Sequence, residues 1–290
     1  MNVVETAWPV ANGFNYLFRF LYSHRFRSNH VLTIPDIPDM VSPSPASSVA
    51  FIAIIAFVSI AIVAGIWRGG PTGEPMDTKR RWGIRAVICM PAWLAIGAVV
   101  PLSGILETKM LPPPPMFLLG ASFLLVVLIA FSSIGLRLAR LPLSALIGFH
   151  AFRLPLELIL HNWYKAGTLP VQMTYEGHNF DIATGILAIV MGTWAMFGQI
   201  PRAADWLFNV IGTSLLAVVI TIALTSSPLP FRQYMNEPQV LLVYHFPFSW
   251  IVSIAVAGAL LGHLVLFRKL LKRADCYIVH TACRILQHNN

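Results

Sequence analysis

Seven stretches of predominantly apolar residues follow one another along this chain, each about as long as a helix that crosses a lipid bilayer. Such a helix needs about 20 apolar residues to span the hydrocarbon core. The stretches are residues 49–67, 86–106, 116–136, 141–164, 180–197, 206–225 and 240–267. Only 11% of the residues are charged, whereas soluble domains carry about 25%. We therefore predict an all-α bundle of about seven transmembrane helices.

The apolar stretches leave no room for a sizeable soluble domain in a chain of 290 residues. Residues 1–46 contain three arginines and end in a Ser/Pro-rich run, so we expect a flexible N-terminal tail. Residues 47–273 form the predicted helix bundle. Residues 274–290 are expected to form a short cytoplasmic C-terminal tail.

The net charge of +8 is divided unevenly between the two sides of the predicted membrane. One side receives 13 of the 20 lysines and arginines, namely Arg68, Lys79, Arg80, Arg81, Arg85, Arg137, Arg140, Arg202, Arg268, Lys269, Lys272, Arg273 and Arg284. Lys and Arg accumulate in cytoplasmic loops. We predict an N-terminus outside and a cytoplasmic C-terminus, in the plasma membrane. The same distribution favours membrane orientation over binding of nucleic acid.

The fourth apolar stretch differs from the others because it carries four ionisable residues. They are His150, Arg153, Glu157 and His161. At about 100° per residue they fall within roughly an 80° arc, and therefore on one face of a helix. Arg153 and Glu157 are four residues apart and can pair directly. An intramembrane charge costs at least about 2.5–3.5 kcal/mol on insertion scales, so the stripe must face protein or water. We favour a functional polar cavity over an ion-pair stripe that only holds helices together.

Further polar residues lie near the predicted outer end of this stretch. They are Glu176, His178 and Asp181 in the following loop, and His245 at the start of the seventh stretch. Asp181 can instead cap the fifth helix. With Glu157 and His161, these side chains could converge at the outer leaflet. Mixed His and carboxylate ligands suit zinc or iron, but no HExxH or His-x-His spacing is present, so the metal and any cofactor stay open.

Small and polar residues in two later stretches predict helix packing. Gly185, Ala188 and Gly192 in the fifth stretch form a stripe that favours close approach of another helix. Asn209 in the sixth stretch is typical of hydrogen bonds between helices, and it is also a candidate for substrate binding. The three cysteines match no zinc or disulfide framework.

One string within the chain resembles a known pattern. It reads Arg153-x-Pro155-x-Glu157-x-x-x-His161, followed by Pro170-x-x-Met173-Thr174-x-x-Gly177-x-Asn179-x-Asp181. Together with the turns at 228–231 and 246–248, it is similar to a family of uncharacterised bacterial polytopic integral-membrane proteins. The resemblance covers about residues 145–270. It implies a bacterial origin, with the bacterial inner membrane as the location, and no particular mechanism.

We favour a small-molecule or ion transporter coupled to protons, with its pathway along the fourth stretch. Glu157 and His161 are the candidates for proton exchange, and Arg153 for holding an anionic group. The candidate substrate-binding residues are Arg153, His150, Glu176, His178, Asp181, His245 and Asn209. The expected partners are the lipid bilayer and a small-molecule or ion ligand, with no nucleic acid.

Three alternatives remain open on the sequence. An intramembrane enzyme would use Glu157 or His161 as a general base on a lipid or other outer-leaflet substrate, with or without a metal. A haem protein would use histidines of the fourth stretch, His150 and His161, together with His245 and His263 of the seventh, as bis-histidine ligands. An assembly protein would instead bind another membrane protein.

Overall fold

The computed structural model describes residues 37–108, 110 and 112–288, with side chains as far as Lys272. Helices and short turns make up this part of the chain, which contains no strand. The α-helices are α2 (Pro45–Arg68), α3 (Met76–Leu102), α4 (Pro114–Phe131), α5 (Ser133–Ala139), α6 (Leu143–Gly148), α7 (Arg153–Lys165), α8 (Ile182–Phe197), α9 (Arg202–Ser226) and α10 (Ala257–His288). The predicted tail at 1–46 lies largely outside the described residues.

Six of the described helical segments are long and apolar enough to cross a membrane. They are Pro45–Arg68, Met76–Leu102, Pro114–Phe131, Leu143–Lys165, Arg202–Ser226 and Ile251–Lys272. A seventh apolar helix, α8, has 16 residues and is therefore about 24 Å long. The prediction of an all-α, multi-pass membrane protein is confirmed, with a span count close to seven.

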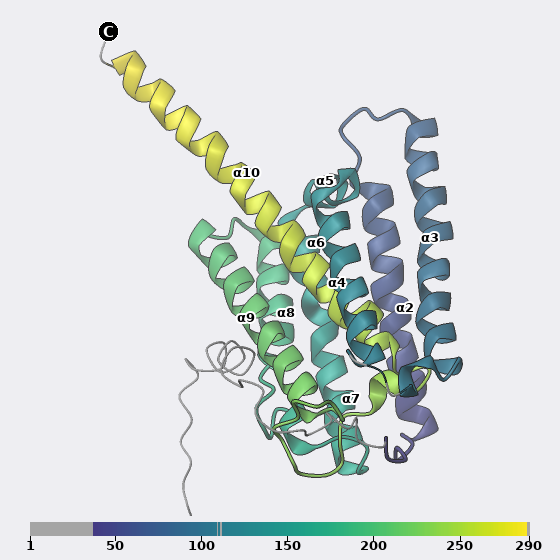
Figure 1. Cartoon of the computed structure of the whole chain (residues 1–290). Helices are drawn as coiled ribbons and strands as arrows, with labels where there is room; N and C mark the ends of the chain where they lie inside the picture. The colour runs from purple at the N-terminus through teal and green to yellow at the C-terminus, as the bar shows by residue number, and fades with distance from the viewer. Residues whose placement is uncertain (1–36, 109, 111, 289–290) are drawn as a thin grey trace, which may run out of the picture. The chain divides into compact units, whose positions relative to one another are not determined.

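The helices pack both against sequence neighbours and against helices distant in the sequence (Figure 1). α2 packs against α3 and α7, while α10 packs against α4 and α9. The apolar core between α2 and α7 contains Phe51 and Trp163, whose ring centroids are 5.4 Å apart. The indole Nε1 of Trp163 donates to the hydroxyl of Ser47 at 2.9 Å. The polar atom of this large buried side chain is thus satisfied inside the bundle.

The last span begins later than the sequence predicted. The prediction placed its start at residue 240, but the helical segment begins at Ile251, as the π-helix η6 (Ile251–Val256) that leads into α10. Residues 240–250 instead contain the 3-10 turn η5 (Leu242–Tyr244) and Pro247. Proline disfavours helical geometry at the residue before it. Ser249 ties this segment to α3 by donating to the carbonyl of Gly97 at 2.8 Å.

The fourth span is assembled from α6, the 3-10 turn η3 (Phe149–Phe152) and α7. α8 lies against all three of these elements. A Cβ atom added at Gly185 would lie 2.4 Å from the backbone nitrogen of Leu154. One added at Gly192 would lie 3.0 Å from the Cα of Gly148. The predicted close packing of the small-residue stripe is therefore confirmed.

The loops rich in lysine and arginine meet at one end of the bundle, which we call the basic end (residues 66–85, 130–142, 198–202 and 266–272). Arg137 of α5 reaches the α2–α3 loop there. Its Nε donates to the carbonyl of Ile66 at 3.0 Å, and its Nη2 to Glu74 Oε2 at 3.0 Å. Trp82 stacks beside it, with 5.1 Å between the guanidinium carbon and the ring centroid. Arg268 of α10 donates to the carbonyl of Ala130 at 2.7 Å.

The Arg137–Glu74 contact gives a prediction for pH. The hydrogen bond from Arg137 holds the pKa of Glu74 below its ordinary value of 4.5. A lowered folded-state pKa contributes stability that is complete above pH 4.5 and is lost as pH falls through the folded-state pKa. Glu74→Gln should lower the melting temperature at neutral pH, and its difference from the wild type should shrink in acid. Asp77→Asn, which removes an exposed carboxylate in the first turn of α3, is the control. A difference independent of pH would contradict the prediction.

Candidate intramembrane polar site

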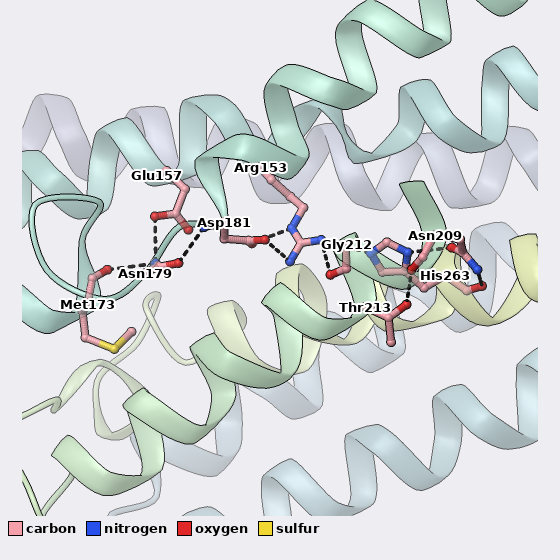
Figure 2. A network of polar contacts seen from close by, with 9 residues as sticks. All are labelled: Arg153, Glu157, Met173, Asn179, Asp181, Asn209, Gly212, Thr213 and His263. Carbon is pink, nitrogen blue, oxygen red and sulfur yellow. Dashed lines mark hydrogen bonds and ion pairs between the residues drawn. The ribbon is translucent and has the colours of Figure 1, made fainter. Parts of the chain in front are cut away.

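A network of buried polar side chains crosses the middle of the bundle (Figure 2). α7 contributes Arg153 and Glu157, each 1% exposed. Arg153 lies ten residues after the start of its span at Leu143, and therefore about 15 Å along the axis. The network thus lies near the middle of this candidate span, where an unpaired charge would be costly in a bilayer.

Arg153 pairs with Asp181, the residue that precedes α8. Its Nε donates to Asp181 Oδ2 at 2.5 Å, and its Nη2 contacts the other carboxylate oxygen. The predicted direct pair between Arg153 and Glu157 is therefore wrong. Asp181 occupies the N-cap position of α8 but makes no capping hydrogen bond with its side chain, because its carboxylate is turned to Arg153. Gly185, one turn into α8, lets this helix approach α7 closely enough for the pair to form.

Glu157 has a different partner, which the list of candidates omitted. Asn179 donates from Nδ2 to Glu157 Oε2 at 2.8 Å and to the carbonyl of Met173 at 3.0 Å. Its Oδ1 accepts from the backbone nitrogen of Asp181 at 3.1 Å. Asn179 therefore links the Glu157 carboxyl group to the backbone at Asp181. The sequence did contain a signal for this role, because Asn179 and Asp181 both belong to the motif that carries the family resemblance.

On its other side, Arg153 contacts the seventh span. Its Nη1 lies 3.0 Å from His263 Nε2. A guanidinium can only donate, so Nε2 accepts and the ring proton is on Nδ1. Nδ1 then donates to Asn209 Oδ1 at 2.8 Å. Asn209 donates in turn to the backbone carbonyl of His263 at 3.2 Å. These contacts fix His263 as a neutral imidazole, and they bring Asn209 into the network as an interhelical hydrogen-bonding residue.

His150 is fully buried and stacks on His263, with ring centroids 4.0 Å apart and planes 28° from parallel. Neither of its ring nitrogens has a hydrogen-bond partner. Face-to-face packing at this distance leaves no room for a porphyrin between the two rings. In this arrangement His150 and His263 therefore cannot ligate one haem between them, while the haem hypothesis stays a prediction for the other histidines. His150 contributes packing against Phe208, whose ring centroid is 5.8 Å away.

The predicted outer-leaflet residues do not gather at one point. His161 Nε2 lies 3.4 Å from Glu176 Oε1, and its ring stacks on Tyr175 at 4.5 Å. His178 lies near Tyr234. His245 follows η5, before Pro247. Among the described residues, no group of three or more His, Cys, Asp or Glu side chains is placed to hold a metal ion.

A cavity of about 110 Å³ adjoins the network between α4, α7, α9 and the last span. We call it the apolar cavity. Its described lining is aliphatic and aromatic, including Met116, Leu156, Val219, Val240 and Ala255. The charged residues in that lining are Arg153, Glu157 and Asp181. Its size is comparable to a 150 Å³ protein cavity that admits benzene.

The charges along this wall do not balance. The network holds two carboxyl groups, those of Glu157 and Asp181, against the single guanidinium of Arg153. His263 is neutral in this arrangement, and protonation of His150 would add a charge with no partner. An uncompensated charge in hydrocarbon is strongly unfavourable. The site therefore requires one more positive charge, which is either a proton on a carboxyl group or a bound cation.

A family model described as a domain of unknown function, DUF8737, matches residues 114–271, more than half of the chain. The chain belongs to this family. The matched segment contains every residue of the network in Figure 2. The resemblance to an uncharacterised family is thereby confirmed, while the bacterial origin stays a prediction. No curated protein and no solved structure matches the chain.

Proposed function

We propose that this DUF8737 protein is a transporter that exchanges a proton for a small cation with an apolar body. The observation that supports the proposal is the single excess carboxyl group on the wall of the apolar cavity. Aliphatic walls favour an apolar body, and the acidic excess favours a cationic head. Arg153 was expected to hold an anionic group, but its contacts with Asp181 give it a positioning role.

Glu157 is the group we assign to proton exchange. Its carboxylate is held by the neutral amide of Asn179 and lines the cavity, whereas Asp181 already has Arg153 as counter-ion. A cation that enters the cavity replaces the proton on Glu157, so that the site stays neutral in both states. His161, one turn further along α7 and paired with Glu176 at the outer end, is a second candidate for passing protons. The basic end is proposed to face the cytoplasm of a bacterium, because it carries the excess of Lys and Arg.

Tetramethylammonium is a suitable probe because its small apolar body of four methyl groups surrounds a permanent positive charge that cannot titrate. Adding it to the purified protein in weakly buffered detergent should release about one proton per bound cation, as measured with a pH indicator. In proteoliposomes, an acidic interior should drive uptake of the radiolabelled probe. Cation binding without proton release, or no binding, would overturn the proposal.

Glu157→Gln should abolish proton release and gradient-driven uptake while leaving the melting temperature close to that of the wild type. Glutamine keeps an oxygen that accepts from Asn179, and Arg153 keeps Asp181 as its partner. The matched control is Glu107→Gln, which removes an exposed carboxylate in the 3-10 turn η2 (Ile105–Glu107) and should leave both activities intact. Normal proton release in Glu157→Gln would remove this residue from the mechanism.

A further inference from the structure

A second cavity, of about 930 Å³, lies at the basic end, far along the helices from Arg153. It is lined by residues 136–143 at the α5–α6 junction, residues 195–202 at the α8–α9 junction, and two lysines of α10. We call it the basic-end cavity. Its volume falls in the range of about 300–1,000 Å³ that is typical of ligand pockets.

Four basic residues line this cavity: Arg140, Arg202, Lys269 and Lys272. The described lining contains no acidic residue. The ammonium of Lys269 is held in place by the carbonyls of Ala139 at 3.0 Å and Leu141 at 2.6 Å. The other three basic side chains are exposed. Several positive charges that converge on one cavity produce a potential that attracts anions.

Two further features fit an anionic ligand. α9 begins at Arg202, which lines the cavity, so the positive end of its dipole lies beside the cavity. Asp205, in the first turn of α9, lies outside the described lining, and its buried carboxylate offsets part of the positive end of the dipole. The remaining wall is apolar and includes Leu136, Leu143 and Ile200. A headgroup site beside apolar side chains suits an amphipathic molecule better than a free ion.

We propose that the basic-end cavity binds a phosphate group, and that its source is the headgroup of an anionic phospholipid. Arg140 and Arg202 are the principal phosphate ligands, because guanidinium groups form paired hydrogen bonds with phosphate oxygens. The apolar wall accommodates the adjoining glycerol and acyl carbons. This site is separate from the transport site and does not depend on the proposed exchange of a proton for a cation.

The test counts phosphatidylglycerol molecules retained by the detergent-purified protein in native mass spectrometry, with phosphatidylcholine as the neutral comparison. Each basic residue near an anionic headgroup contributes roughly fivefold to affinity. Arg140→Gln with Arg202→Gln should therefore weaken phosphatidylglycerol binding by roughly 25-fold. The matched control is Arg80→Gln with Arg81→Gln, which removes two exposed charges from α3 outside the cavity. Arg140→Lys with Arg202→Lys should keep part of the binding, because lysine keeps the charge but cannot form the paired hydrogen bonds.

Equal loss in the cavity and control variants would overturn the proposal, because it would show general attraction between charges rather than a site. Unchanged binding in the cavity variant would overturn it as well. Inorganic phosphate, added as a competitor and measured by equilibrium dialysis, distinguishes the two sources. Weak competition by phosphate supports a lipid headgroup. Displacement of the lipid by phosphate at low concentration would keep the phosphate site but reject the lipid as its source. If the cavity variant proves unstable, Lys272→Gln should still weaken lipid binding roughly fivefold.

Discussion

Asp181→Asn should lower the free energy of unfolding by about 3–5 kcal/mol, the cost of leaving a buried charge without its partner. Arg153 is 1% exposed and makes two contacts with the Asp181 carboxylate. An asparagine cannot neutralise the guanidinium, which then remains charged near the centre of the membrane. Arg153→Met should have an effect of similar size, because it leaves the carboxylate unpaired. The loss is measured by unfolding both variants in detergent, either by heating or by titration with SDS.

Double substitutions identify the true partner of Arg153. Arg153→Met with Asp181→Asn removes both charges and should recover part of the stability lost in either single variant. Arg153→Met with Glu157→Gln should recover less of it, since Glu157 accepts from Asn179 and makes no direct contact with Arg153. The reverse pattern, with rescue by Glu157→Gln, would show that the i,i+4 pair expected from the sequence is the real one. A stable Asp181→Asn variant would show that water reaches the pair.

Gly185→Ala should destabilise the protein by about 1–3 kcal/mol, the usual cost of overfilling a packed contact. The added Cβ would lie 2.4 Å from the Leu154 backbone nitrogen and 2.8 Å from its Cα. Backbone atoms cannot move aside as a flexible side chain does, so α8 would have to shift away from α7. That shift would also pull Asp181 from Arg153, and the substitution should therefore reduce cation binding as well as the melting temperature.

Gly120→Ala provides the matched control for this substitution. Gly120 also lies within an apolar membrane helix, α4, but an added Cβ there meets no atom within 4 Å. The control should be neutral or slightly stabilising, because alanine favours helix by about 1 kcal/mol relative to glycine. Equal melting temperatures for the two alanine variants would show that α8 can move without cost.

The sequence alone determined the class of fold and the face on which the polar residues lie. A run of about 20 apolar residues is stable in hydrocarbon only as a helix, because every backbone N–H and C=O must be paired there. The number of such runs therefore predicted the bundle. The 3.6-residue period likewise placed Arg153 and Glu157 on a common face, and both are buried in the described structure. The late start of the last span escaped prediction, since hydropathy alone does not separate a buried apolar loop from a helix.

Only the tertiary structure decided which charges pair. Sequence spacing gives the neighbours of Arg153 along its own helix, and Glu157 is one of them. The partner that it contacts, Asp181, comes from the N-terminus of another helix, whose approach depends on the absence of a side chain at Gly185. The contact with His263, 110 residues away in the chain, likewise depends on how α10 packs. In a low-dielectric interior a charged side chain pairs with the strongest partner within its reach. Helix packing, rather than local sequence, determines which partners are within reach.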